Sequence, residues 1–251
     1  MYNKSVIEML ELEVQVMGGT DRIYPAVVYG EERAMLVDTG YPGLGTRLMD
    51  ALAGLGISAD QLDAIMITHQ DLDHIGSLPE LLALKEKGIT VLAHELERPY
   101  IEGQRMLLKH TPEALAAAES MLPPDLPAPW REAFLRVLKH PPHAPVNTVV
   151  ADGDELEGGL CVIHTPGHSP GHISLYHRPS RILIAGDALT TAGDVLFGPD
   201  PAATPDMETA LDSLRKLADY DIDSVICYHG GWYRGEANKR IAALAKAKPH
   251  C

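Results

Sequence analysis

The short stretch from His69 to His74 limits most strongly what this chain can fold into. It follows the apolar run of residues 64–67. Within six residues it contains two histidines and two aspartates: His69, Asp71, Asp73 and His74. A strand that opens into a loop lets such side chains converge, and divalent metal ions bind this mixture of nitrogen and oxygen donors. The stretch therefore predicts a metal site; the alternative is a solvated polar turn before a helix.

Three later stretches have the same arrangement, in which a donor side chain follows apolar residues and has glycine beside it. The donors are His168, Asp187 and His229. Glycine lets the backbone approach closely or adopt a positive φ angle. Loops at the carboxyl ends of neighbouring strands can converge on one point, so we expect these residues to join the first stretch in a single site.

Apolar periodicity predicts an alternation of strands and helices that occurs twice along a single domain of residues 1–251. Strands are expected at about 10–16, 26–29, 34–37, 63–68, 90–93, 146–150, 155–156, 160–164, 173–176, 181–185 and 224–228. Helices are expected at about 44–56, 77–87, 207–218 and 236–247.

Residues of about 95–147 interrupt this alternation with helical pieces and a cluster of prolines. The helical pieces are expected at Gln104–Lys109 and Glu113–Met121. A linker between domains is one interpretation, but strands resume directly afterwards, which favours an inserted helical lid. Three histidines of this insertion are candidates for contact with a substrate: His110, His140 and His143.

Charge and cysteine content restrict the partners and the compartment. The formal net charge is −14, which argues against binding nucleic acid or an anionic membrane. The first residues contain acids and no long apolar core, so we predict neither a signal peptide nor a membrane span. The cysteines are Cys161, Cys227 and Cys251. This odd set without a close pair favours free thiols in a reducing cytoplasm.

The motifs at residues 69–74, 165–168, 186–187 and 229–230, in this order, resemble those of the metallo-β-lactamase superfamily of metal-dependent hydrolases. Asp38-Thr39-Gly40 matches the early Asp-x-Gly turn of that family. The resemblance implies an α+β fold in four layers, an αββα sandwich of two mixed sheets with helices outside. It also implies a site at one edge of the sandwich.

The resemblance also implies a set of ligands for two divalent metal ions. Carried over by position, they are His69, Asp71 and His168 for one metal, and Asp73, His74 and His229 for the other. Asp187 would bridge the two metals, and a hydroxide between them would be the nucleophile. Two cations lower the pKa of such a water toward neutrality.

Three residues are expected to assist this centre. Asp73 would orient the attacking hydroxide or pass its proton to the leaving group. Asp38 and His172 would hydrogen-bond to ligands, although a turn residue before glycine and the start of a strand are the respective alternatives.

The motif departs from the usual His-x-His-x-Asp-His at Asp71, where the family has a second histidine. The carboxylate adds one negative charge and a harder donor. Zinc is the first expectation for both metals, and Asp71 leaves iron or manganese open.

The first functional hypothesis is hydrolysis of an ester, thioester or lactone of a small metabolite, as in the glyoxalase II and acyl-homoserine-lactonase branches. The alternatives are a di-iron redox or sensor protein on the same fold and a phosphoesterase. A homodimer is left open.

Overall fold

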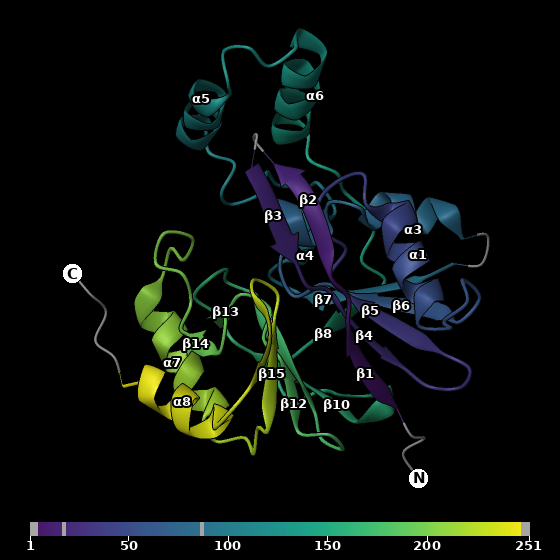
Figure 1. Ribbon diagram of the computed structural model, residues 1–251, viewed down its shortest axis with the longest axis vertical. Helices are drawn as coiled ribbons and strands as arrows, with labels where there is room; N and C mark the ends of the chain where they lie inside the picture. The colour runs from purple at the N-terminus through teal and green to yellow at the C-terminus, as the bar shows by residue number, and fades with distance from the viewer. Residues whose placement is uncertain (1–4, 17–18, 86–87, 247–251) are drawn as a thin grey trace.

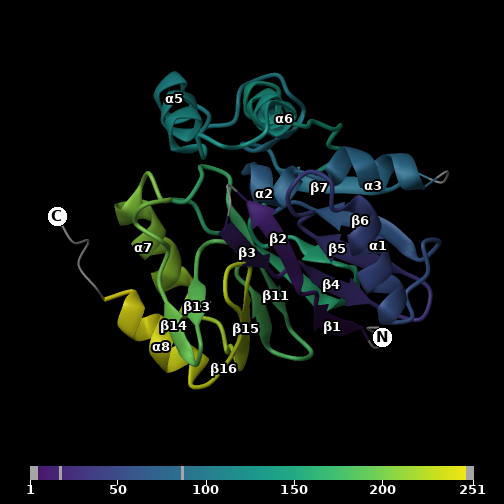
Figure 2. The same cartoon turned by 45° about the horizontal axis from the view of Figure 1, so that its top comes forward.

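Two mixed sheets pack face to face, and helices cover their outer faces. This computed structural model describes residues 5–16, 19–85 and 88–246. Figure 2 shows the four layers in sequence: α1 and α3, the first sheet, the second sheet, then α7 and α8. The predicted α+β αββα sandwich is confirmed. No helix in the described part of the chain is long and apolar enough to cross a membrane.

The first sheet has six strands, and its neighbours from β5 to β8 run parallel. Its order is β1 (Val6–Met9), β4 (Ala26–Tyr29), β5 (Ala34–Val37), β6 (Leu62–Met66), β7 (Thr90–His94) and β8 (Thr148–Val150). Two helices cover its outer face: α1 (Gly45–Gly54) and α3 (Leu78–Leu84). Strands β4 and β5 form the predicted hairpin.

The second sheet also has six strands, and its strands β12 and β15 pair in parallel. Its order is β16 (Gly231–Arg234), β15 (Ser224–Cys227), β12 (Ile182–Ile184), β11 (Ile173–His177), β10 (Leu160–His164) and β9 (Glu155–Leu156). Its outer helices are α7 (Met207–Leu217) and α8 (Ala237–Leu244).

Two short hairpins flank the sheets, and neither was predicted as such. They are β2 (Leu12–Val16) with β3 (Gly19–Ile23), and β13 (Thr190–Ala192) with β14 (Val195–Phe197). Strand β16 was also missed. The predicted helices reached residues 86–87 and 247, and these residues, like Cys251, lie outside the described part of the chain.

Three clusters of buried apolar side chains separate the four layers. The middle cluster joins the sheets and includes Val28 and Met66 of the first and Val162 and Ile226 of the second. The other two lie beneath the outer helices. Because burying one large aliphatic side chain stabilises the fold by about 1.5–3 kcal/mol, these clusters fix the two sheets relative to each other.

The insertion between β7 and β8 contains α4 (Arg98–Ile101), α5 (Pro112–Met121) and α6 (Ala128–Lys139). Helix α5 confirms the predicted helix at Glu113–Met121. The helix predicted at Gln104–Lys109 is wrong: these residues form turns and bends, and the Leu108 N–H donates to the side chain of Gln70. Figure 1 shows α5 and α6 beyond one end of the sandwich.

Helix α6 was not predicted because prolines crowd its beginning. Pro127 is its N-cap residue and Pro129 lies in its first turn. A proline there costs no hydrogen bond, since the first N–H groups of a helix have no partner within the helix.

Candidate metal centre

The predicted ligands lie on loops that follow the carboxyl ends of strands from both sheets. After β6 the chain passes through His69 and Asp71 into the short helix α2 (Leu72–Ile75), which contains Asp73 and His74. His168 follows β10, Asp187 follows β12 and His229 follows β15. Strands β10, β12 and β15 run in the same direction in the second sheet, so their carboxyl ends lie at one edge. The grouping of the donor atoms shows that the loop after β6 meets them there.

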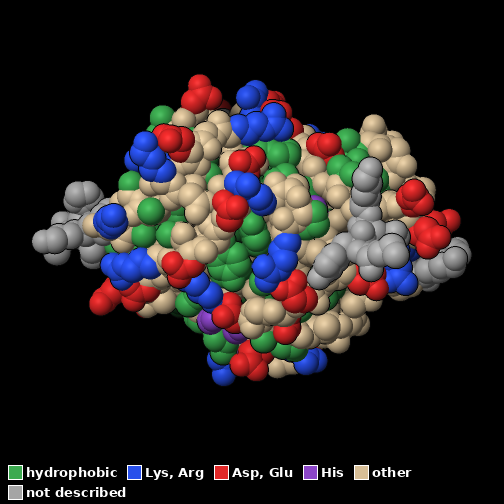
Figure 3. Space-filling model, turned by 90° about the horizontal axis from the view of Figure 1, so that it is seen from below, with side chains coloured by type: hydrophobic (Ala, Val, Ile, Leu, Met, Phe, Trp, Pro, Cys, Tyr) green, Lys and Arg blue, Asp and Glu red, His purple; other side chains and the backbone are tan. Residues whose placement is uncertain are grey.

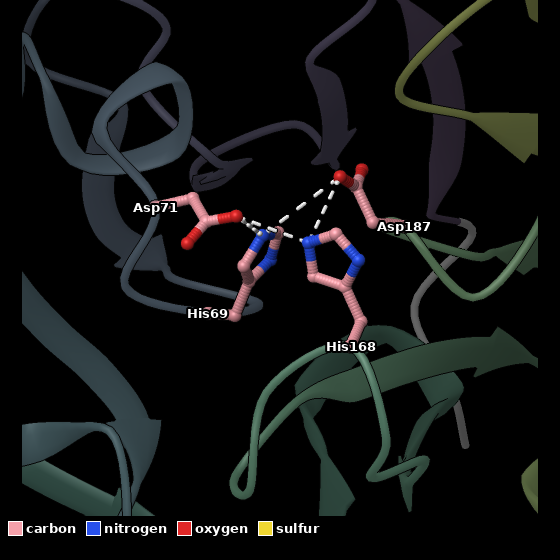
Figure 4. A group of neighbouring side chains, drawn as sticks. All are labelled: His69, Asp71, His168 and Asp187. Atoms are coloured by element: carbon pink, nitrogen blue, oxygen red, sulfur yellow. Dashed lines mark hydrogen bonds and ion pairs between the residues drawn. The ribbon is translucent and has the colours of Figure 1, made fainter. Parts of the chain in front are cut away.

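Four of these residues form a first group, His69, Asp71, His168 and Asp187 (Figure 4). One donor atom from each lies within 4.8 Å of the others. Asp71 Oδ2 is 3.2 Å from His69 Nε2 and 3.0 Å from His168 Nε2. These side chains project toward a common point, as a metal ion requires.

Asp73, His74 and His229 form a second group, whose donor atoms meet the same 4.8 Å limit. Asp73 Oδ2 is 3.6 Å from His74 Nε2 and 3.2 Å from His229 Nε2. Asp187 faces both groups: its Oδ1 is 3.4 Å from His74 Nε2, and its Oδ2 is 3.3 Å from His168 Nε2. The position of Asp187 suits a shared carboxylate.

Three buried donor atoms of the two groups have no hydrogen-bond partner within the described residues: His69 Nε2, His74 Nε2 and Asp187 Oδ1. A buried polar atom without a partner costs about 1–3 kcal/mol. Imidazole nitrogens and carboxylate oxygens are common ligands of divalent transition metals. The residues therefore fit the metal centre that the sequence predicts.

Asp38 holds the loop that bears the first ligands. Its Oδ1 accepts the Thr68 backbone N–H at 2.8 Å, and its Oδ2 is 2.8 Å from Thr68 Oγ1 and 2.9 Å from His74 Nδ1. Asp38 has φ 64°, a sparsely populated conformation for a residue other than glycine. The hydrogen bond from His74 Nδ1 leaves Nε2 of that ring directed at the metal position.

His172 supports Asp187 from behind. Its Nε2 accepts the Asp187 backbone N–H at 3.0 Å, so its own proton is on Nδ1, 2.9 Å from Thr165 Oγ1. Burial holds the pKa of His172 well below its usual value, and the neighbouring His69 and His168 add to this effect. Gly186 is required here, because a Cβ at this position would lie 2.7 Å from His172 Nε2.

Opposite charges at the centre shift the pKa values of its residues. Burial alone would raise the pKa of Asp187, but the surrounding His74, His229 and His69 hold it well below its usual range. Burial opposes protonation of His229, yet Asp73 and Asp187 raise its pKa to about 9. The carboxylates therefore attract positive charge, which protons supply when no metal ion does.

Two charged residues at the centre were not predicted. Lys109 Nζ contacts Asp71 Oδ2 and lies 2.7 Å from His168 Nε2. Glu97, buried before α4, accepts the Gln70 N–H at 2.9 Å, the Ser169 hydroxyl at 2.8 Å and the Gly171 N–H at 2.7 Å. Neither residue belongs to a motif, so the sequence contained no signal for it.

The three histidines of the insertion differ in their surroundings. His110 Nδ1 is 2.9 Å from the carbonyl oxygen of Leu138, and His140 and His143 are exposed. Contact of these residues with a substrate stays a prediction. Cys161 and Cys227 are buried in strands, and neither forms a disulfide within the described residues.

Known proteins similar to this chain include metal-dependent hydrolases. A model of the metallo-beta-lactamase superfamily matches residues 19–229. The probable metallo-hydrolase YflN of Bacillus subtilis (strain 168) is 33% identical over 208 residues, which cover 78% of this chain and 75% of that protein. A hydroxyacylglutathione hydrolase of Aeromonas salmonicida (strain A449) is 31% identical; the match covers 82% of this chain but 60% of that protein.

Solved structures share the architecture. A metallo-beta-lactamase family protein from Thermus thermophilus superposes with a TM-score of 0.66 at 27% identity, over 95% of this chain and 78% of that one. The chemotaxis sensor ODP, solved as a peroxy diiron species, superposes with a TM-score of 0.62 over 98% of this chain and 92% of that one. Its 19% identity shows the fold alone.

Proposed function

This chain belongs to the metallo-β-lactamase superfamily and has buried His/Asp clusters that suit a metal-dependent hydrolase, and from that premise we propose that it uses a dinuclear site to cleave an ester, thioester or lactone of a small metabolite. The observation that carries the proposal is Asp187, a buried carboxylate between two groups of donors. One carboxylate that faces both groups suits a pair of metal ions better than a single one.

Bound divalent cations would supply a water of lowered pKa and would polarise the scissile carbonyl. The side chains of the protein would orient the attacking water and carry a proton to the leaving group of the substrate. The Asp73 side chain is 18% exposed, more than that of Asp71 or Asp187, so a substrate can reach it. Its Oδ2 is 3.2 Å from His229 Nε2. We propose that Asp73 would orient the attacking hydroxide or pass its proton to the leaving group when metal ions are bound.

The names of the relatives favour the carbon–sulfur bond of a thioester over phosphoesters. Hydroxyacylglutathione hydrolases recur among them, including GloC of Haemophilus influenzae at 26% identity over 81% of this chain and 82% of that protein. Their name describes removal of an acyl group from a thiol. We therefore place acyl thioesters first in the panel of substrates, followed by lactones, with phosphoesters as the alternative.

The test is hydrolysis by the metal-reconstituted protein on a panel of thioesters, lactones and phosphoesters. Asp187→Ala removes the shared carboxylate, so we expect bound metal to fall by at least one ion per chain and hydrolysis to fall at least a hundredfold. The matched control is Asp125→Ala, at an exposed position beside α6, and it should retain both. Asp187→Ala with unchanged metal content and activity would contradict the proposal.

Asp71 favours a second candidate, a di-iron redox or sensor protein, because a carboxylate is a harder donor than the histidine usual at this position. Metal analysis together with a visible absorption spectrum separates the candidates. Iron with redox turnover and without hydrolysis would support the second one. Asp71→His, which restores the usual motif, should then shift the bound metal toward zinc.

A further inference from the structure

Lys109 enters the metal centre from the insertion, and the position of its backbone is fixed. The Leu108 N–H donates to Gln70 Oε1 at 2.9 Å, and Gln70 is fully buried between His69 and Asp71 in the sequence. The Lys109 side chain extends from this anchor, is 30% exposed, and ends with Nζ at Asp71 Oδ2 and His168 Nε2. Two of the four donors of the first group are therefore engaged by one ammonium.

The contact with His168 cannot coexist with a metal ion on the same nitrogen. An ammonium only donates, so His168 Nε2 accepts from Lys109. The ring proton is then on Nδ1, which lies 3.3 Å from Thr204 Oγ1. A neutral imidazole has one lone pair on its unprotonated nitrogen, and a bound metal ion would need that same lone pair.

We propose that Lys109 is a tethered cation that occupies the first metal position of the metal-free protein and must withdraw when a metal ion binds there. The ammonium contacts both Asp71 Oδ2 and His168 Nε2, and these two atoms are 3.0 Å apart. It neutralises Asp71 as a metal ion would. Filling the first position requires breaking both Lys109 contacts, whereas filling the second position leaves both of them in place.

Asp71, at which the motif departs from the usual histidine, supplies the negative charge that Lys109 contacts. A histidine at that position would offer no negative charge to Lys109, so Asp71 and Lys109 act as a pair. The pair weakens metal binding at the first position relative to the second. Metal ions therefore load in order, the group of Asp73, His74 and His229 first.

This inference depends on metal binding, as the proposed function does, but it is tested by metal affinity and lysine labelling instead of hydrolysis. A failure of this inference and a failure of the proposed function therefore give different experimental results. A protein that binds two metal ions without hydrolysing any panel substrate would contradict the proposed function and leave the role of Lys109 open to its own test.

The first experiment uses the unaltered protein. Zinc is titrated into the chelator-treated chain, and the acetylation rate of Lys109 by an amine-reactive ester is followed by mass spectrometry. We expect little change with the first equivalent and a several-fold rise with the second, as Nζ moves into solvent. Lys139, exposed at the end of α6, is the internal control and should not respond. A Lys109 rate that stays constant or falls at saturating zinc would overturn the proposal.

The second experiment compares zinc binding to Lys109→Met and to the control Lys139→Met by calorimetry. Methionine keeps the length of the side chain and removes its charge. We expect the weaker of the two zinc affinities to tighten at least tenfold in Lys109→Met and the stronger to change little. Lys139→Met should match the unaltered protein. Identical isotherms for all three proteins would contradict competition by Lys109.

Discussion

At the scale of single residues, the centre is prepared by hydrogen bonds that select one nitrogen of each of three buried ligand histidines. His69 Nδ1 is 3.1 Å from Thr68 Oγ1, His74 Nδ1 is 2.9 Å from Asp38 Oδ2, and His168 Nδ1 is 3.3 Å from Thr204 Oγ1. In all three rings Nε2 is left to face the other donors. Such supports fix the tautomer and the orientation of a ligand, which strengthens metal binding.

His172 predicts how stability depends on pH. Its pKa is held well below the usual value in the folded protein, while the unfolded chain takes up a proton near pH 6.5. The unfolded state then binds more protons below this pH, so the free energy of unfolding falls as the pH falls. The contribution of His172 to stability is therefore lost as the pH falls through about 6.5.

The substitution His172→Gln keeps an acceptor for the Asp187 N–H but does not titrate. Urea unfolding of both proteins in chelator should show a smaller loss of stability between pH 7.5 and 5.5 in the variant than in the unaltered protein. Each protein is compared with itself at pH 7.5, which cancels the cost of the substitution. Equal losses in the two proteins would show that His172 is not the residue responsible.

At the scale of elements, the ligand loops belong to different sheets and are tied together by Glu97. This buried carboxylate binds the loop after β6 through Gln70 and the loop after β10 through Ser169 and Gly171. Burial raises the pKa of Glu97, and the hydrogen bonds from Ser169, Gly171 and Gln70 oppose that rise. The insertion thus contributes to the site at its beginning, well before α5 and α6.

Glu97→Gln should loosen both loops. The amide of glutamine replaces one carboxylate oxygen by an NH₂ group, so at least one of the donors that now reach Glu97 would lose its acceptor. We expect unfolding to become easier by about 1–3 kcal/mol. Metal affinity should weaken as well, since His69, Asp71 and His168 lie on the two loops. Denaturant unfolding and calorimetry measure these effects, with the exposed Glu95→Gln as the matched control. A variant with unaltered stability and metal affinity would show that these hydrogen bonds do not hold the site.

At the scale of the whole molecule, negative charge is spread over the surface and concentrated at one buried place. The chain has 35 acidic and 21 basic residues. On the face in Figure 3 acidic and basic side chains are interspersed. The metal centre instead gathers Asp71, Asp73 and Asp187 at the edge where the two sheets meet. Metal ions bound there would join loops of both sheets and neutralise their mutual repulsion.

Removal of metal should therefore lower the stability of the entire fold. Free metal at a hundred times its dissociation constant stabilises the folded state by about 2.7 kcal/mol. For a chain of this size that corresponds to about 5–10 °C in Tm. Calorimetric scans with zinc and with chelator measure the difference. Asp187→Ala should show a much smaller difference in Tm. An unaltered protein whose Tm is the same with zinc and with chelator would contradict a metal centre that joins the sheets.

The sequence by itself determined most of the strands and helices and the donors that follow them, whereas the arrangement in four layers was implied by the family resemblance. The local sequence encodes both the elements and the donors. Apolar periodicity marks a strand or a helix, and a strand whose end lies at one edge precedes each of the donor stretches: His69–His74, His168, Asp187 and His229. The hairpin of β13 and β14 and the strand β16 were missed because they are short, and helix α6 because prolines crowd its start.

Only the tertiary structure decided what surrounds those donors. Lys109 meets Asp71 across 38 residues of sequence, and Glu97 meets Gln70 across 27. Both lie on irregular chain after β7, whose path is set by packing and by hydrogen bonds to the ligand loops, and no periodic pattern encodes such a path. The charge on Asp71 could be seen in the sequence, but the cation that balances it is brought there by the fold.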